Sequence, residues 1–410
     1  MKQLKNALSI VLITLLISMV LQVPNLGHAQ GRFSDVQPDH WAHDRINWLA
    51  GQGVLQGYPD GTFRPDNPIR RGDMAILLCR LLQTGTLTPT ASSFADVSVN
   101  DYDFPFIEVV RKTQLMSDSI SGNQFRPNEK LTRIEFAPII VRTLAMKYFA
   151  DKLSPMMISE TVQGFIDRAD IPAWSQKYLT IAVKAELMRG FPDGSFRPHE
   201  DLTRAQIAYV LYEILFPDPA DDGKATHLFT DVNQTEFHAI LTRKLAPSLF
   251  RFSGQSIPGG KVSMVFNDIP MKEVQVLPSG EYTVLLPICF IHVGEIKFKA
   301  TYHDQAGNPR HSFDFYSSTP FDLFPNWHRA YALSYYPLQQ MMVYESTLAH
   351  PMSIEVNNKT TDQEKTYDIQ GNEPFRMEIE LRQGRNDVDM IIMNPIDTWR
   401  LTVGMIITVD

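Results

Sequence analysis

The apolar residues of this chain change along its length from a helical to a strand-like spacing. Between residues 31 and 216 they recur three or four positions apart, which indicates helices that each bury one face. In the first such segment, the pattern predicts one helix over 40–50 and a second over 70–82. From residue 248 onward, apolar runs of strand length lie between turns rich in Gly and Pro. The sequence therefore predicts a helical N-terminal half and an all-β C-terminal half.

Three diverged copies of one repeat fill the helical half. Each copy opens with Phe-x-Asp, continues with a Phe-Arg-Pro turn, and places Ile or Leu six residues after the Phe of that turn. The two phenylalanines are 30, 31 and 31 residues apart in the three pairs Phe33/Phe63, Phe94/Phe125 and Phe165/Phe196. Spacing this constant indicates one structural unit used three times, with a helix on each side of the turn.

The second copy departs most from the pattern. The Pro-Asp-Gly that precedes the turn in the other copies is replaced by Ser-Ile-Ser-Gly-Asn at 119–123. The tryptophan expected at the start of its first helix is replaced by Tyr102 or Phe104. We therefore expect this copy to bind any shared ligand weakly. Residues 228–232 resemble the start of a fourth copy of the repeat, and we interpret this segment as a cap on the array.

These patterns predict the following order of domains. A signal peptide is expected at 1–29, the three repeats at 31–83, 93–147 and 163–216, a linker and capping segment at 217–247, and two immunoglobulin-like β domains at 248–330 and 331–410. The three repeated segments at 31–83, 93–147 and 163–216 are called repeat one, repeat two and repeat three below.

The N-terminal leader predicts export. A basic start, an apolar run over 7–21 and a small-residue ending at Ala29 form the order of a secretory signal peptide. An uncleaved anchor is the alternative, but the apolar run is shorter than the ~20 residues that a membrane-spanning helix needs. We therefore expect cleavage after Ala29 and no integral membrane span in the mature chain.

Composition narrows the classes of function. A formal net charge of −8 argues against a nucleic-acid partner, because nucleic acid requires a basic face. The two cysteines, Cys79 and Cys289, are expected to be free and buried rather than bridged. His40 and His43 lie close in sequence without a third ligand nearby, so no metal or other cofactor is expected. No hydrolase or phosphate-binding motif is present, which predicts a protein that is not an enzyme.

The repeats resemble the S-layer homology (SLH) domain. The resemblance rests on Phe-x-Asp-Val, a helix-start Trp, Gly-(Tyr/Phe)-Pro-Asp-Gly-x-Phe-Arg-Pro and (Ile/Leu)-Thr-Arg, and it covers residues 31–216. It implies a multidomain fold that begins with a three-pronged, α-helical pseudo-trimer with ligand grooves between the prongs. It also implies non-covalent attachment to cell-wall polysaccharide, such as a pyruvylated polymer or another peptidoglycan-linked glycan. The β half resembles bacterial immunoglobulin-like sandwiches more loosely, through the segment 302–309.

The resemblance also implies which residues bind the glycan. An Arg fork matches the carboxylate of a pyruvyl group, a Trp face packs on sugar C–H groups, and an Asp accepts hydrogen bonds from hydroxyls. The alternatives are that Trp fills the core, that Asp braces a turn, and that Arg pairs with a neighbouring acid. The candidate residues are Asp35, Trp41, Gly57 and Arg71 in repeat one, Asp96 and Arg133 in repeat two, and Asp167, Trp174, Gly190 and Arg204 in repeat three.

Together these observations predict a secreted, non-catalytic anchor of the cell wall or cell surface. The β domains would then form a lattice, spacer or adhesive module, with lateral self-assembly as a possible consequence. One alternative is a secreted carbohydrate-active enzyme or inhibitor whose effector lies in 248–410. Another is an array that has lost its ligand and only assembles subunits. Because repeat two is the most altered, Arg133 is expected to contribute less to binding than Arg71 or Arg204.

Overall fold

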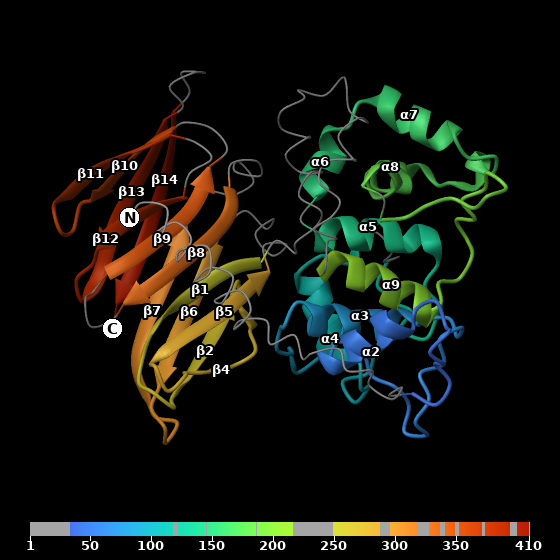
Figure 1. The fold of residues 1–410 in the computed structure, drawn as a ribbon, viewed down its shortest axis with the longest axis horizontal. Helices are drawn as coiled ribbons and strands as arrows, with labels where there is room; N and C mark the ends of the chain where they lie inside the picture. Colours follow the sequence, from blue (N-terminus) through green and yellow to red (C-terminus); the bar gives the residue numbers. More distant parts are fainter. Residues whose placement is uncertain are drawn as a thin grey trace, which may run out of the picture. The chain divides into compact units, whose positions relative to one another are not determined.

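The computed structural model shows a helical region followed by a region rich in β-sheet, as the sequence predicted (Figure 1). It describes residues 33–117, 122–144, 146–185, 187–215, 249–287, 296–317, 328–336, 341–348, 352–370, 374–393 and 400–409. The leader at 1–29, the linker at 217–247 and Cys289 therefore lie outside the described residues. No helix within those ranges has the length and apolar character needed to cross a membrane.

The helices follow the repeat pattern. Repeat one contributes α2 (His43–Gly51) and α3 (Arg71–Leu81), and repeat two contributes α4 (Phe104–Lys112) and α5 (Arg133–Thr143). Repeat three contributes the short helix η3 (Ala173–Ser175), α8 (Gln176–Lys184) and α9 (Arg204–Leu215). Between the second and third repeats lie α6 (Lys147–Lys152), α7 (Pro155–Gln163) and the short helix η2 (Arg168–Asp170).

In repeats two and three, side chains cap the start of the second helix, whereas α3 has no side-chain cap at Arg70. In α5, the Thr132 side chain accepts from the backbone N–H of Glu135, and the Glu135 carboxylate accepts from the backbone N–H of Thr132. This reciprocal pair is a capping box, which satisfies backbone donors that the first turn leaves without helical partners. Repeat three uses an amide for the same purpose, because Gln206 Oε1 accepts from Thr203 N at 3.0 Å.

The second helix of one repeat packs against the first helix of the next. Helix α3 contacts α4, and α5 contacts both η3 and α8. We call these contacts interface 1–2 and interface 2–3. The chain correspondingly divides into two compact units, Met1–Pro65 and Asp66–Asp410. The boundary between the two units lies inside repeat one, between α2 and α3.

A closed cycle of backbone hydrogen bonds joins the three repeats. Ile69 N donates to the carbonyl of Leu202, Leu202 N to that of Leu131, and Leu131 N to that of Ile69, each at 2.9 Å. These are the Ile or Leu that follows the Phe-Arg-Pro turn by six residues. Two positions later, a second set of 2.9 Å bonds joins the same repeats in the opposite direction, from Arg71 N to Glu129 O, Arg133 N to Glu200 O, and Arg204 N to Asn67 O.

The β region forms two sheets. The strands are β1 (Leu249–Gln255), β2 (Lys261–Phe266), β3 (Ile269–Pro270), β4 (Val274–Gln275), β5 (Glu281–Pro287), β6 (Ile296–His303), β7 (Pro309–Ser317), β8 (His328–Tyr336), β9 (Met341–Leu348), β10 (Met352–Asn358), β11 (Gln363–Ile369), β12 (Pro374–Glu380), β13 (Gly384–Met393) and β14 (Arg400–Val409). One sheet has the order β12-β9-β8-β1-β5, and the other β11-β10-β13-β14-β7-β6-β2-β3, with β4 beside β2.

Both sheets run across the boundary predicted at residue 330. Strand β1 pairs with β8 in parallel, and β14 pairs with β7 antiparallel (Figure 1). The expected domains 248–330 and 331–410 therefore do not each have sheets of their own, which corrects the predicted division. The sequence pattern locates strands but not their partners, because pairing between distant strands depends on the tertiary fold.

Aromatic residues fill the space between the two sheets in the first part of the region. Phe252 on β1 contacts Phe298 on β6 and Phe313 on β7, with ring centroids 5.2 and 5.8 Å apart. The hydroxyls of Tyr282 on β5 and Tyr302 on β6 lie 2.8 Å apart and are buried. Each of these side chains is at most 4 % exposed, so together they form a continuous core.

Candidate functional site

The Asp of each Phe-x-Asp motif holds the turn of its own repeat. Asp35 Oδ1 accepts from Phe63 N and Asp35 Oδ2 from Arg64 N, both at 2.7 Å. The same two bonds recur in the other repeats at 2.7–2.9 Å, from Phe125 N and Arg126 N to Asp96, and from Phe196 N and Arg197 N to Asp167. Among the alternatives predicted for these carboxylates, the geometry therefore favours bracing of a turn.

The braced turn holds a strained residue. Arg64, Arg126 and Arg197 have φ values of 58°, 60° and 56°, in the left-handed region that side-chain-bearing residues rarely adopt. Such a conformation costs of order 1–3 kcal/mol and persists only where surrounding bonds enforce it. The paired bonds to the Asp carboxylate supply that enforcement in all three repeats.

In repeats one and three, the Pro-Asp-Gly acid pairs with this strained arginine. Arg64 Nη2 lies 2.8 Å from Asp60 Oδ2, and its guanidinium stacks 3.9 Å above the Tyr58 ring. Asp60 Oδ1 also accepts from the Thr62 hydroxyl at 2.6 Å, and this bond chiefly lowers the pKa of Asp60 to about 2. Repeat three repeats the arrangement, with Arg197 2.9 Å from Asp193.

Repeat two lacks that acid and uses different partners. Arg126 Nη1 donates to Glu129 at 3.0 Å, and Arg126 Nη2 donates to Glu135 at 3.3 Å. The altered sequence at 119–123 thus coincides with a change in the ion pairs of the turn, while the Asp96 brace is retained.

The candidate glycines Gly57 and Gly190 allow a close contact between backbone and ring. A Cβ on Gly57 would overlap the Phe33 ring and lie 2.6 Å from Thr62 O. A Cβ on Gly190 would lie 2.7 Å from Cε1 of Phe165. Both glycines thus permit the Phe of Phe-x-Asp to pack directly against the backbone before the turn.

An exposed aromatic residue precedes the first helix of every repeat. Trp41 is 54 % exposed, Tyr102 72 % and Trp174 43 %, whereas Phe104 is buried. Tyr102 is therefore the residue of repeat two that takes the place of the tryptophan, a choice that the sequence left open. All three lie directly before the N-cap of the helix, which is Ala42, Asp103 or Ser175 in turn.

Arg71 is fully buried and joins repeat one to repeat two. Its Nε donates to Phe125 O at 2.8 Å, and its Nη1 lies 3.0 Å from Glu135 Oε1. Burial lowers the pKa of the guanidinium, and the Glu135 carboxylate opposes that effect. Interface 1–2 therefore contains a buried cation that is neutralised by an anion from the next repeat.

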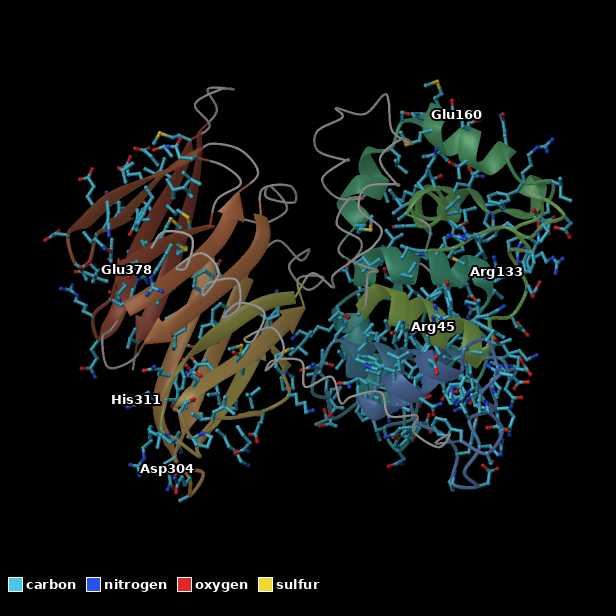
Figure 2. All side chains as sticks on the ribbon, viewed as in Figure 1. Arg45, Arg133, Glu160, Asp304, His311 and Glu378 are labelled. Atoms are coloured by element: carbon cyan, nitrogen blue, oxygen red, sulfur yellow. The ribbon has the colours of Figure 1, made fainter. Side chains whose placement is uncertain are left out.

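Arg133, labelled in Figure 2, begins α5 as Arg71 begins α3, but its partners are different. Its Nε donates to Phe196 O at 3.0 Å and its Nη2 to Arg189 O at 2.8 Å, and the side chain is buried. Within the described residues no carboxylate lies within ion-pair distance of Arg133. The reason is visible in the sequence, because the place of Glu135 in the next repeat is taken by the neutral Gln206.

Interface 2–3 also carries an exposed aromatic residue. Trp174 lies on η3, and η3 packs against α5, which begins at Arg133. The fold thus brings these two sequence-predicted residues to one interface. The remaining candidate, Arg204, begins α9 and is half-buried, and its backbone N–H takes part in the cycle that joins the repeats.

Metal and thiol chemistry receive no support from the described residues. No group of three or more His, Cys, Asp or Glu in those ranges is arranged to hold a metal ion. His43 Nδ1 instead lies 2.9 Å from Asp44 Oδ1. Cys79 is buried as predicted, and burial raises the pKa of its thiol to about 12.

The family model of the S-layer homology domain matches residues 32–75 and 164–208. The S-layer protein sap of Bacillus anthracis is 29 % identical over 196 residues, covering 48 % of this chain and 23 % of the relative. A cellulosome-anchoring protein of Acetivibrio thermocellus is 28 % identical over 198 residues, covering 46 % and 42 %. An endoglucanase of Bacillus sp. strain KSM-635 is 28 % identical over 227 residues, covering 54 % and 23 %.

Each of these matches spans less than half of the relative's own length. Among solved structures, a biofilm-associated protein BSP domain aligns with a TM-score of 0.19 at 11 % identity, covering 36 % of this chain and 24 % of that chain. We infer no relationship of fold from a score at that level. The family and the surface-protein relatives support secretion to the cell wall or cell surface, as predicted. Two segments of the chain, residues 32–75 and 164–208, therefore match the S-layer homology domain.

Proposed function

We propose that this protein is a non-catalytic anchor that attaches to the cell envelope by binding an acidic wall polysaccharide at interface 2–3. The observation that carries the proposal is Arg133, a buried guanidinium that bonds two carbonyls and has no carboxylate within ion-pair distance among the described residues, although the charges of Glu200 and Asp167 still act on it. A buried charge that lacks a counter-charge is costly, and binding of an anion offsets that cost. The three repeats would form a pseudo-threefold array, which the cycle of bonds through residues 69, 131 and 202 supports.

The ligand that suits Arg133 is a sugar bearing a compact carboxylate, such as a pyruvyl ketal. A guanidinium stays charged and presents several donors in one plane, so it can receive a carboxylate while keeping its carbonyl bonds. Trp174 at the same interface offers a flat face to the sugar ring. Arg71 is less suitable because Glu135 already neutralises it. We therefore propose the reverse of the order expected from the sequence, with Arg133 contributing more than Arg71.

The other candidate residues divide into two groups. Trp41 is exposed like Trp174, and we propose that it contacts glycan. For Asp35, Asp96 and Asp167, both carboxylate oxygens already accept backbone hydrogen bonds, so we propose that they hold the turns beside the grooves. Gly57 and Gly190 would act in the same indirect way, by keeping the ring contact of their repeats.

The β region would be displayed from this anchor. Relatives that are named as S-layer and cellulosome-anchoring proteins support a role in attachment or presentation. We propose that its two sheets serve as a spacer, lattice or adhesive module. Binding partners of this region and lateral assembly belong to the same proposal.

Calorimetric titration of the mature protein with a pyruvylated disaccharide tests the site. Trp174→Ala is the principal variant, because a side chain that is 43 % exposed is removed with little effect on folding. We expect its affinity to fall about tenfold, while Ile166→Ala, which removes a 69 % exposed side chain, leaves affinity unchanged. Equal affinity in the Trp174 variant and the wild type would contradict the proposed site.

A second variant tests the charge. Arg133→Gln removes the guanidinium fork, and a charge-assisted contact contributes about 1.5–3 kcal/mol, so we expect binding to weaken tenfold or more. Lys359→Ala removes one exposed positive charge in the β region and serves as the matched control. Thermal melting of each variant separates loss of binding from loss of fold, because Arg133 also bonds two backbone carbonyls.

A further inference from the structure

Interface 1–2 carries a carboxylate where interface 2–3 carries a hydroxyl. Asp103 is the N-cap residue of α4, and Ser175 is the N-cap residue of α8. The side chain of Asp103 makes no capping hydrogen bond to the first turn of α4, so the helix dipole and a hydrogen bond to its own backbone are what favour the carboxylate there. Ser175 is fully buried and donates to Pro172 O at 2.8 Å.

The first turn of α3 makes room for Asp103. A Cβ on Gly72 would overlap Oδ2 of Asp103, so the carboxylate lies directly against the backbone of the glycine. The corresponding residue of α5 is Ile134, whose backbone N–H donates to Pro198 O of repeat three at 3.0 Å. A small residue thus accompanies the acid at interface 1–2, and a large residue accompanies the serine at interface 2–3.

The charges around Asp103 leave it without a dedicated counter-ion in the described part of the chain. Arg70 is the nearby cation, but its Nε and Nη2 bond the two oxygens of Asp73 at 3.1 and 2.9 Å. Asp101 and Asp73 add negative charge, and together with burial they raise the pKa of Asp103, with burial as the largest cause. Arg71 at the same interface is already paired with Glu135.

The aromatic face needed to hold a sugar is still present. Tyr102, next to Asp103 in sequence, is 72 % exposed, and its hydroxyl lies 3.4 Å from Arg80 Nη2 on α3. Interface 1–2 therefore combines an exposed ring with a half-buried anion, whereas interface 2–3 combines an exposed ring with a buried cation.

We infer that Asp103 sets the charge preference of interface 1–2, so that this interface disfavours acidic sugars and binds a sugar bearing a free, protonated amino group. An ammonium group would provide the counter-charge that Asp103 lacks, and a pyruvyl carboxylate would be repelled. This inference rests on the proposed function, because it assumes that the inter-repeat interfaces bind glycan. The two interfaces would then recognise differently charged units of wall polymer.

The test compares two probes on the full mature chain by calorimetry. The probes are a chitosan oligosaccharide, at a pH where its amino groups are protonated, and a pyruvylated disaccharide. Asp103→Ser introduces the residue of repeat three, and Arg133→Gln is the variant of the other interface. We expect Asp103→Ser to weaken chitosan binding about tenfold or more, and Arg133→Gln to leave it unchanged. We also expect Asp103→Ser to leave the disaccharide affinity at interface 2–3 intact.

The outcomes separate this inference from the proposed function. If the wild type binds the pyruvylated disaccharide through Arg133 but binds chitosan equally with and without Asp103, the inference fails and the anchor proposal stands. The inference also fails, and the anchor proposal stands, if the wild type does not bind chitosan. If Asp103→Asn weakens chitosan binding as Asp103→Ser does, with unchanged melting of both variants, the charge rather than the shape of Asp103 is responsible. If neither probe binds, both proposals fail.

Discussion

At the scale of single residues, most of the motif that defines the repeats maintains local backbone geometry. Asp35 holds two consecutive amides, Gly57 admits a ring, and Asp60 pairs with Arg64. Such roles explain why these residue types recur at constant spacing even without direct contact to a ligand. The two residues that distinguish one interface from another, Gln206 and Asp103, lie outside the most regular parts of the motif.

The contact of Gly57 with Phe33 predicts a measurable loss of stability. Gly57→Ala places a methyl group against the ring and against Thr62 O, and overpacking of this kind costs about 1–3 kcal/mol. Gly51→Ala is the matched control, because no atom lies within 4 Å of its added Cβ and Ala favours a helix. Chemical denaturation of the two variants checks the prediction. Equal free energies of unfolding would show that Gly57 is not needed for packing.

The bonds of Asp60 predict an acid-resistant turn. Its folded-state pKa of about 2 lies below the ordinary 3.8, so its contribution to stability is fully present above about pH 4. That contribution is lost as the pH falls through about 2. NMR titration of the carboxyl carbon measures this pKa directly. Thr62→Ala should raise the pKa more than Arg64→Ala does, because the Thr62 hydroxyl is its largest cause. A native pKa near 3.8 would contradict the turn geometry.

At the scale of elements, the second helices of repeats one and two pack on the first helices of the next repeat. Helix α3 packs on α4, and α5 on α8, so each repeat completes the hydrophobic face of its neighbour. The side chain of Arg71 follows the same rule, since it reaches Glu135 and Phe125 of the next repeat. The packing of the helices is therefore a property of the interfaces, and one repeat alone would expose an unpaired face. Under the proposed function, ligand binding is a property of the interfaces as well.

The Asp brace predicts that repeat two is structurally intact. Asp96→Ala removes two hydrogen bonds from a charged acceptor to Phe125 N and Arg126 N, and we expect a cost of roughly 2–4 kcal/mol. Asp66→Ala, at an exposed position, should change stability by less than about 0.5 kcal/mol. Thermal melting measures both. Lost glycan binding with unchanged melting of Asp96→Ala would instead assign the carboxylate to direct ligand contact.

At the scale of the whole molecule, the helical array and the β region are expected to have separate tasks. A fragment spanning 31–247 should bind purified cell-wall sacculi, because it contains all three repeats and both described interfaces. A fragment spanning 248–410 should remain in solution. Co-sedimentation with sacculi before and after extraction of the wall polymer checks this prediction. Sedimentation of the second fragment alone would assign wall binding to the β region.

The same fragments test the catalytic alternative. An endoglucanase is among the relatives, although the match covers only 23 % of its length. Release of reducing sugars from wall polysaccharide by residues 248–410 would support the alternative, in which this region is a carbohydrate-active enzyme. We expect no release above that of a buffer control.

Much of the helical region could be predicted from the sequence, because its signals are local. The helical period, the capping sequence at Thr132 and the constant distance from Phe33 to Phe63 each act over a few turns of chain. These local signals were sufficient to predict the repeats, the order of helices before strands, and the burial of the Cys79 thiol. The family resemblance followed from the same local motifs, and the comparisons confirmed it at residues 32–75 and 164–208.

Only the tertiary structure decided which residues meet. The partner of Arg71 is 64 positions away, and only the structure shows that Arg133 bonds two backbone carbonyls and, among the described residues, no carboxylate. Likewise β1 pairs with β8, and β7 with β14, across a boundary that strand patterns alone placed near residue 330. The physical reason is the same in both cases. Hydrophobic period and turn chemistry are encoded by neighbours in sequence, whereas charge compensation and strand pairing depend on neighbours in space.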